Sequence, residues 1–257
     1  MRLDQYLVEQ GLAKSRSFAK TLITDGYVTV GEQVVQKPAY DIAGDQTVHL
    51  TGTPYTYVSR GGVKLEAALD GFGIQPAGMC ALDIGASSGG FTDCLLRRGA
   101  ARVYAVDSGT GQLDPVLARN PRVVNMEHCN ARALTPADIG AACGLCVMDV
   151  SFISQKLILA AIPPLLAEDG ILISLIKPQF ECGRSGLSKN GIVKDWRIRR
   201  EAVRGVLEAA VAVNLAPAGL MPSPVQGGDG NVEFLLYCRL GGIPRVDEQR
   251  ILEVCRQ

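Results

Sequence analysis

The sequence lacks both an excess of one charge and a long apolar segment. Lys plus Arg and Asp plus Glu each number 26 in 257 residues, so the formal net charge is zero. Charge alone therefore predicts no nucleic-acid partner, and such a partner must be argued from local basic patches. No apolar run approaches the roughly 18 residues that span a bilayer. The longest, 157–167, contains two prolines, so stable membrane insertion is not expected.

The sequence also has little that would serve export or metal binding. Its first ten residues carry two acids and no apolar core of a signal peptide, which favours a cytoplasmic protein with reduced cysteines. One Cys-x-x-Cys pair, Cys143 and Cys146, stands without a second pair. The two histidines, His49 and His128, are far apart in the sequence. Because a structural zinc site needs four such ligands, we expect no metal.

The composition is that of a folded protein with one large domain, or with a large and a small one. Hydrophobic residues make up 47% of the chain and charged residues 20%, which excludes a wholly disordered protein. The pattern changes along the chain. We expect a small domain at residues 1–50, a linker rich in turn-forming residues at 51–58 and a large domain at 59–257.

Residues 1–50 are typical of a small α+β domain. Spaced leucines predict a short helix that ends near Gly11. Ser15 can cap a second helix, whose apolar face includes Leu22 and Ile23. Short strands separated by turns are expected near 27–30, 33–35 and 48–50.

This segment resembles the S4 RNA-binding domain over nearly its whole length. The matching stretches, in order, are Arg2-Leu3-Asp4, Ser15-Arg16, Leu22-Ile23 with Gly26, Lys37-Pro38 and Gly44-Asp45. In that family a basic helix face contacts RNA phosphates, which position a protein on RNA. The resemblance implies such contacts for Arg2, Lys14, Arg16 and Lys20. Residues 1–50 hold five basic and six acidic residues, so the expected affinity is modest and sensitive to salt.

From residue 60 onward, predicted strands and helices alternate. Unbroken apolar runs, typical of strands buried on both faces, lie at 81–84, 102–107, 123–126, 145–149 and 170–176. Helix-like segments lie near 112–119, 155–166 and 195–213. This alternation predicts an α/β, Rossmann-like fold with a doubly wound parallel sheet. We expect the last strand, 232–240, to run antiparallel against a strand near 218–221.

A glycine-rich turn joins the first of these strands to a helix. It reads Gly85-Ala86-Ser87-Ser88-Gly89-Gly90, where glycines let the backbone approach a ligand closely. Asp83 precedes the turn, and Asp107 ends the next strand, where a carboxylate can hold ribose hydroxyls. The turn is neither GxGxxG nor GxxxxGK[ST], which disfavours NAD and nucleoside triphosphates.

This arrangement resembles motif I of S-adenosylmethionine-dependent methyltransferases and so implies that cofactor. The resemblance implies cofactor contacts from Asp83, the turn 85–90, Phe91, Asp107 and Asn130. Taken without the resemblance, Asp83 has the alternative of a solvated strand end.

Two lysines and two acids are expected at the edge where a sheet of this kind binds ligands. Lys64 begins a helix after Gly-Gly, Asp149 and Lys177 end the fourth and fifth strands, and Glu233 begins the last one. The carboxyl ends of parallel strands share one edge, so Asp149 and Lys177 should face the glycine turn. Glu233 joins them if the last strand is antiparallel.

The order Lys64, Asp149, Lys177, Glu233 resembles RNA 2'-O-methyltransferases of the FtsJ/RrmJ type. With the S4-like segment, the whole chain resembles the TlyA family, often described as hemolysin A. The matching stretches are SRGGVKL, LDIGASSGGFTD, VDSGTGQL, MDVSFIS, LIKPQFE and GDGNVEF. The resemblance implies methylation of cytidine ribose 2'-hydroxyls in ribosomal RNA or ribosomal subunits, with these four residues as the catalytic set.

The four residue types suit this reaction, because a ribose hydroxyl must lose its proton as it attacks a methyl group. We expect Lys177 to orient the hydroxyl and, when neutral, to accept its proton. Lys64 and the cofactor's sulfonium disfavour a second positive charge there. Asp149 and Glu233 are expected to position the two lysines, and in-line orientation of the methyl group should supply much of the acceleration.

Further basic residues extend the predicted RNA contacts. Arg60 precedes Lys64, and Arg184 and Lys189 belong to a polar loop that could close over a flipped-out nucleotide. A basic helix start at 194–200 could add to this footprint, whereas Trp196 is expected in the core.

Two other functions stay open at this point. One is a membrane-lytic protein of the hemolysin type, although no strongly amphipathic basic helix stands apart from the folded pattern. The other is an RNA-binding protein whose methyltransferase fold is inert, which the complete four-residue set and glycine turn disfavour.

Overall fold

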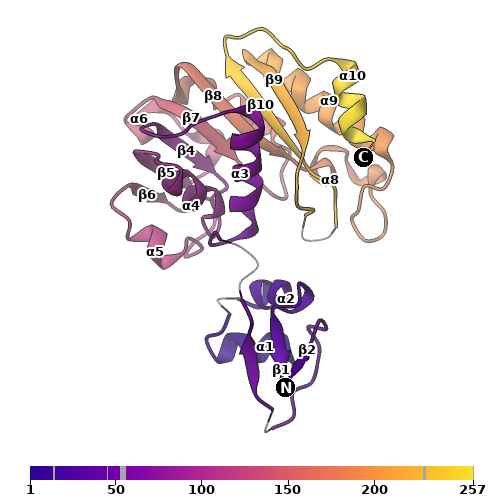
Figure 1. The fold of residues 1–257 in the computed structure, drawn as a ribbon. Helices are drawn as coiled ribbons and strands as arrows, with labels where there is room; N and C mark the ends of the chain where they lie inside the picture. Colours follow the sequence, from indigo (N-terminus) through magenta and orange to yellow (C-terminus); the bar gives the residue numbers. More distant parts are fainter. Residues whose placement is uncertain (14, 45, 53–55, 228–229, 257) are drawn as a thin grey trace. The chain divides into compact units, whose positions relative to one another are not determined.

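The computed structural model describes residues 1–13, 15–44, 46–52, 56–227 and 230–256. The chain forms two units, Met1–Thr56 and Tyr57–Gln257, each with its own core (Figure 1). The second unit begins inside the segment expected to be the linker, because Tyr57 is buried and Val58 packs against the same core. The expectation that these two residues belong to a linker was therefore wrong.

The first unit consists of two helices and a three-stranded antiparallel sheet in the order β2-β1-β3. Its elements are α1 (Leu3–Glu9), α2 (Arg16–Thr24), β1 (Val28–Val30), β2 (Gln33–Val34) and β3 (Val48–Leu50). The Ser15 hydroxyl accepts the backbone N–H of Phe18 at 3.2 Å, which confirms the predicted cap. Leu22 and Ile23 are fully buried, so the predicted apolar face of α2 forms the core.

The second unit is built on a seven-stranded sheet. Its strands are β4 (Cys80–Ile84), β5 (Arg102–Val106), β6 (Val123–Met126), β7 (Cys143–Met148), β8 (Leu166–Ile176), β9 (Leu215–Pro222) and β10 (Phe234–Leu240). The α-helices are α3 (Arg60–Phe72), α4 (Gly90–Arg97), α5 (Pro115–Ala118), α6 (Pro136–Ile139), α7 (Lys156–Leu159), α8 (Pro178–Glu181), α9 (Trp196–Ala212) and α10 (Glu248–Cys255). Three short 3-10 turns lie at η1 (Ala131–Ala133), η2 (Pro163–Leu165) and η3 (Arg184–Gly186).

The strand order is β6-β5-β4-β7-β8-β10-β9. The first five strands pair in parallel, which confirms the Rossmann-like sheet. β10 runs antiparallel to both β8 and β9, as the sequence predicted. The order reverses between β4 and β7, and ligands of such sheets bind at the carboxyl ends beside this switch point.

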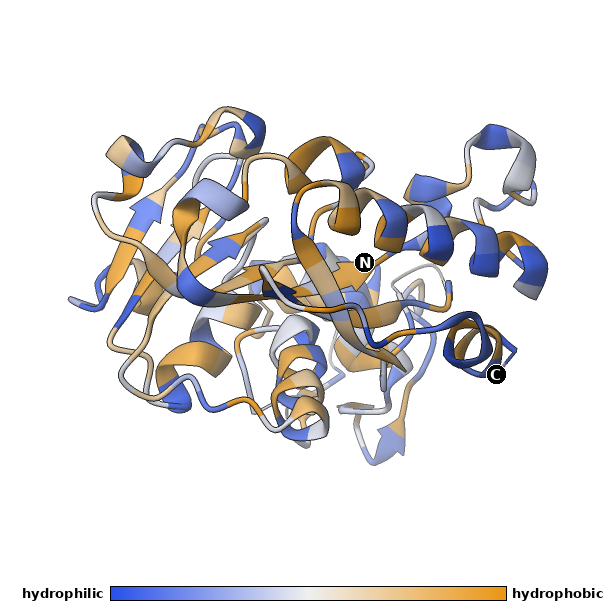
Figure 2. Ribbon diagram, turned by 90° about the horizontal axis from the view of Figure 1, so that it is seen from above, coloured by the Kyte–Doolittle hydropathy of each residue, from blue (hydrophilic) through white to orange (hydrophobic). Residues whose placement is uncertain are grey.

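Each strand supplies side chains to two separate cores, one on either face of the sheet. In β4, Leu82 and Ile84 join the core that includes α9 and α10, whereas Ala81 joins the core of α3 and α4. Figure 2 shows mostly hydrophobic strands in the middle of the sheet and helices that carry both hydrophobic and hydrophilic segments. Because side chains alternate along a strand, Asp83 faces α4, on the same side as Ala81.

The structure departs from the sequence prediction in three helical segments. The expected helix at 155–166 is split into α7 and η2, because Pro163 and Pro164 cannot continue an α-helix. α10 was not predicted. Trp196 was expected in the core, but it is only partly buried at the start of α9. Within the described ranges, no helix has both the length and the apolar character needed to cross a membrane.

Candidate active site

Three of the predicted catalytic residues lie at the same edge of the sheet. Asp149 and Lys177 directly follow the parallel strands β7 and β8, so both lie at the carboxyl ends of their strands. β10 is antiparallel to β8 and pairs Phe234 with Ile176, so the preceding Glu233 lies at this edge as well. The antiparallel direction of β10 therefore decides that an acid from the end of the chain reaches the site.

Lys177 is held by two oxygens. Its Nζ lies 2.6 Å from Oδ1 of Asp149 and donates a hydrogen bond of 2.7 Å to Oγ of Ser151. The Lys177 side chain is 11% exposed, so its ammonium group is oriented but still accessible from solvent. A lysine side chain has four rotatable bonds, and two fixed oxygen partners restrict it to one position.

Lys64 forms a second pair, with Glu233. α3 packs against β10, and Lys64 Nζ lies 2.5 Å from Glu233 Oε2. Lys64 is 7% exposed and Glu233 3%, so each charge depends on the other for compensation. The structure thus places the four residues in two ion pairs at this edge of the sheet, one almost buried and one accessible.

The glycine turn packs tightly against the end of the strand that precedes Asp149. A Cβ atom added at Gly85, where φ is +82°, would lie 2.5 Å from the carbonyl oxygen of Asp149. A Cβ atom at Gly90 would lie 2.2 Å from Oγ of Ser59, just before α3. Only glycine fits such close approach. A cavity of about 170 Å³ lies here, lined by Ser59, Gly61, Gly85, Ala86, Ser87, Ser88, Gly90, Phe91, Asp149, Ser151 and Lys177.

Asp83 is not a solvated strand end, so that alternative was wrong. The side chain is fully buried, and Oγ1 of Thr92 donates a hydrogen bond of 2.6 Å to its Oδ2. Burial raises the pKa of Asp83 to about 7, because it disfavours the charged carboxylate. Asp83 thus braces α4 against β4 directly below the glycine turn.

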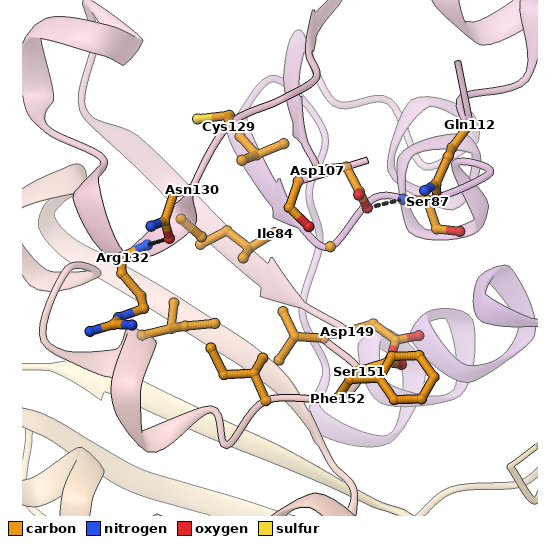
Figure 3. Close-up of a pocket in the computed structure, with 17 residues that line it drawn as sticks. Ile84, Ser87, Asp107, Gln112, Cys129, Asn130, Arg132, Asp149, Ser151 and Phe152 are labelled. Carbon is orange, nitrogen blue, oxygen red and sulfur yellow. Dashed lines mark hydrogen bonds between the residues drawn. The ribbon is translucent and has the colours of Figure 1, made fainter. Parts of the chain in front are cut away.

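Asp107 ties the glycine turn to the loop after β5. Its Oδ2 accepts the backbone N–H of Ser87 at 2.8 Å, and its Oδ1 accepts that of Gly109 at 2.7 Å. Figure 3 shows the bond to Ser87 and places Asn130 and Arg132 on another side of the same cavity. Each carboxylate oxygen of Asp107 keeps a further lone pair, which can accept a ligand hydroxyl.

This larger cavity of about 390 Å³ adjoins the edge of the sheet at Asp149 and Ser151. Its polar residues include Asp107, Asn130 and Asp149, and its apolar walls include Ile84, Val106, Val150, Ile153 and Ile158. Apolar walls with a few convergent polar groups fit a nucleoside, whose base needs a hydrophobic slot and whose ribose needs a carboxylate. The residues present therefore fit an adenosyl group.

The comparisons with known proteins agree with both units. The S4 domain family matches residues 1–48, and the family described as FtsJ-like methyltransferase matches residues 57–240. The Mycobacterium tuberculosis protein named 16S/23S rRNA (cytidine-2'-O)-methyltransferase TlyA is 42% identical over 239 residues, which cover 93% of this chain and 89% of that protein. The chain belongs to the TlyA family of FtsJ-like methyltransferases.

Two further relatives cover nearly the whole length of this TlyA-family chain. Bacillus subtilis YqxC, named as a candidate rRNA methyltransferase, is 42% identical over 98% of this chain and 92% of its own length. A solved structure from Streptococcus thermophilus, described as a candidate hemolysin, is 40% identical and covers 100% of this chain and 94% of that one, with a TM-score of 0.81. The fold of the second unit is that of S-adenosylmethionine-dependent methyltransferases.

The sequence analysis missed two residues of this TlyA-family site. Ser151 accepts the hydrogen bond from Lys177, and Phe152 lines the larger cavity with its side chain 91% exposed. Phe152 has a φ of +65°, in the left-handed region, and its ring lies 5.3 Å from that of Phe180. An exposed aromatic residue in a strained backbone, directly after Ser151 and close to Asp149, is a functional signal. The motif MDVSFIS contained it, but only the structure shows its exposure.

In the S4 unit, the predicted RNA-binding residues differ in their surroundings. Arg2 and Arg16 are both paired with the buried carboxylate of Asp4, at 2.9 and 3.0 Å. Lys20 is exposed and forms no ion pair with any described residue. Lys14 lies outside the described residues. Asp4 thus holds the guanidinium groups of Arg2 and Arg16 close together and offsets part of their positive charge.

In the methyltransferase unit, Arg184 and Lys189 are exposed and Arg60 is partly exposed. None of the three forms an ion pair with a described residue, which leaves their charges open to an anion. Within the same described ranges, no three His, Cys, Asp or Glu side chains group as a metal site would require. Cys143 and Cys146 lie buried in β7, and the thiol of Cys143 contacts that of Cys80 at 3.5 Å.

Proposed function

We propose that this protein transfers a methyl group from S-adenosylmethionine to the 2'-hydroxyl of a cytidine ribose in ribosomal RNA. The observation that carries the proposal is the placement of Lys177 Nζ, between Asp149 and Ser151, on the wall of the cavity at the glycine turn. The proposed substrate follows from the names of the relatives. Ribosomal RNA is made and assembled in the cytoplasm, where we propose that the protein acts.

The cofactor would be held by residues of the two cavities. When bound, it supplies an electrophilic methyl group on a sulfonium. Asp107 would accept the ribose hydroxyls, and Asn130 would lie beside the base, as the lining of the larger cavity allows. Backbone N–H groups of the turn 85–90 and the side chain of Phe91 would orient the methionine end of the cofactor. Asp83 would support this turn from below.

Lys177 would act on the ribose hydroxyl. Its Nζ is positioned to accept a hydrogen bond from the hydroxyl and to take the proton as the oxygen attacks, provided that the amine is neutral at that moment. Lys177 Nζ would take the hydroxyl proton while the ribose oxygen accepts the methyl group that the bound cofactor would supply. Asp149 and Ser151 would keep Nζ in line with the hydroxyl, and the Lys64–Glu233 pair would hold α3 against the start of β10 at the same edge of the sheet.

Phe152 supports an extruded nucleotide as the substrate. The ribose hydroxyl of a nucleotide stacked in an RNA helix cannot reach a cavity at the edge of the sheet. The nucleotide therefore has to leave its stack. The exposed ring of Phe152 stands at the mouth of the larger cavity, where a flipped base could stack on it. Base stacking on aromatic rings is common in the recognition of unpaired RNA.

The proposal is tested by measuring methyl transfer from a tritiated cofactor to purified ribosomal subunits and to transcribed 16S and 23S RNA. The 2'-O-methyl positions in the product are then mapped. Lys177→Ala and Lys177→Arg should bind RNA like the wild type but lose at least about 100-fold in turnover, the scale of general-base catalysis. Lys156→Ala is the matched control, since Lys156 lies on α7, lines neither cavity and has only a 3.8 Å ion pair. Near-normal turnover by Lys177→Ala would refute the role of Lys177.

The same preparation separates the two alternative functions. A hemolysin-type protein would release dye from lipid vesicles without any cofactor, and an inert fold would bind RNA but transfer no methyl group. Wild-type protein that transfers methyl groups to RNA and leaves vesicles intact supports the proposed function over both.

A further inference from the structure

A cluster of three arginines surrounds Trp196, the single tryptophan of the chain. The guanidinium carbons of Arg197, Arg200 and Arg256 lie 5.7, 5.8 and 4.9 Å from the centre of its ring. Trp196 and Arg200 are partly buried, whereas Arg197 and Arg256 are exposed. We call these four residues the Trp196 surface.

Most of the positive charge on the Trp196 surface is not compensated within the described chain. Arg200 pairs with Glu201, but neither Arg197 nor Arg256 forms an ion pair with a described residue. Arg204, one turn further along α9, is by contrast bound by both Glu201 and Glu248. Like charges gathered on one ring repel each other, so this surface favours a bound polyanion.

The Trp196 surface lies at the catalytic edge of the sheet. The chain leaves β8 at Lys177, forms α8 and η3, and then begins α9 at Trp196. α8 packs against α9, and a Cβ atom at Gly186 would lie 3.0 Å from Cγ2 of Ile198, so η3 rests on the first turn of α9. α10 lies beside α9, and its last turn brings Arg256 to the ring (Figure 1).

We infer that the Trp196 surface binds the ribose-phosphate backbone of ribosomal RNA to one side of the target nucleotide. This inference rests on the proposed function for its substrate. A guanidinium group can donate two parallel hydrogen bonds to phosphate oxygens, and contact with the Trp196 ring would restrict the orientation of these groups. The exposed Arg184 and Lys189 lie on the segment between Lys177 and α9 and add two further positive charges to it.

The surroundings of the ring favour RNA over an anionic membrane. A tryptophan that anchors a protein in a bilayer has an apolar ring face that can enter the interface. Here cationic groups lie against the ring, and Asp195, Arg197 and Arg200 lie within a few residues of Trp196. The exposed guanidinium groups of Arg197, at the start of α9, and of Arg256, at the end of α10, can each pair with a phosphate of a nucleic-acid strand.

The double variant Arg197→Gln/Arg256→Gln tests this inference in the full chain. With transcribed 16S and 23S RNA as the probe, its dissociation constant should rise about tenfold or more at low salt, and the slope of log affinity against log salt should fall by about 2. In methyl transfer, KM for RNA should rise more than kcat falls. Trp196→Leu should give a smaller change in the same direction, because the arginines lose the ring that orients them.

Arg245→Gln is the matched control, because Arg245 is exposed and follows β10 at the opposite end of that strand from Glu233. Thermal unfolding shows whether each variant is folded. An unchanged dissociation constant and salt slope in the folded double variant would overturn the inference, as would a loss that appears only on phosphatidylglycerol vesicles. Failure of the proposed function is a separate result, since the wild type would then bind RNA without methylating it.

Discussion

Lys64 and Glu233 are 169 residues apart in sequence, yet Nζ of one lies 2.5 Å from Oε2 of the other. Both side chains are almost completely withdrawn from water. The pair joins α3, at the start of the methyltransferase unit, to the beginning of β10, the last strand of the chain. A buried pair of this kind stabilises the fold little by itself, but loss of either partner leaves an uncompensated charge.

We therefore expect Glu233→Gln to lower the free energy of unfolding by about 3–5 kcal/mol, because Lys64 stays buried without its counter-charge. Urea unfolding followed by tryptophan fluorescence measures this in the methyltransferase unit, since Trp196 is the single tryptophan. The double variant Lys64→Met/Glu233→Leu should regain most of the stability but no methyl transfer. If the double variant also transferred methyl groups, the Lys64–Glu233 pair would have a structural role only and no role in the reaction.

Phe152→Gly should change stability and activity in opposite directions. Glycine adopts the φ of +65° without strain, so stability should rise by about 1 kcal/mol. Loss of the ring should lower kcat/KM for RNA about 10- to 100-fold, because stacking on one base contributes about 1–3 kcal/mol. Chemical unfolding and methyl-transfer kinetics measure the two effects.

Ile243→Gly is the matched control for Phe152, since Ile243 is also a strongly exposed apolar side chain and lies after β10. It should leave methyl transfer as in the wild type. Full activity of Phe152→Gly would show that the exposed ring has no part in holding the nucleotide.

Asp83 should make stability depend on pH. Its folded pKa of about 7 is well above the unfolded value of 3.8, so between these values the folded protein holds a proton that the unfolded chain has lost. Stability from this group is therefore fully present below about pH 4 and is lost as pH rises to about 7, by up to about 4 kcal/mol.

The free energy of unfolding of the wild type minus that of Asp83→Asn, measured from pH 4 to pH 8, isolates this contribution. The difference should decrease steadily with rising pH and level off above about pH 7. A difference that stays constant across this range would mean that Asp83 is ionised in the folded protein at acidic pH.

Asp4 should have the opposite pH dependence in the S4 unit. Hydrogen bonds from Arg2, aided by Arg16, lower the pKa of Asp4 to about 2, so its stabilising effect is present above about pH 4 and is lost as pH falls towards 2. Asp4→Asn should therefore speed hydrogen exchange in α1 and α2 at pH 7. RNA affinity should also fall, because Arg2 and Arg16 lose the carboxylate that aligns them.

Lys20→Gln is the comparison for Asp4→Asn, since Lys20 is exposed and forms no ion pair with a described residue. It should lower RNA affinity with no change in hydrogen exchange. Equal RNA affinity for Asp4→Asn and the wild type would show that the aligned arginines do not contact RNA.

The sequence was sufficient wherever a local pattern decides the structure. Unbroken apolar runs indicated the parallel strands, and a hydroxyl before an amphipathic segment indicated the Ser15 cap. The order of acids and lysines at strand ends indicated which side chains share an edge. These features depend on residues within a few positions of each other, or on the general rule that parallel strands align their carboxyl ends.

Tertiary packing decided what no local pattern contains. Asp83 could have been solvated, and only the placement of α4 over β4 buries it. Trp196 looked like a core residue, but Arg256 reaches its ring only because α10 lies beside α9. Phe152 is a large apolar side chain, which usually packs in a core, yet its backbone is left-handed and the side chain is exposed. Burial and pairing are properties of the packed fold rather than of the segment, because they depend on which elements lie side by side.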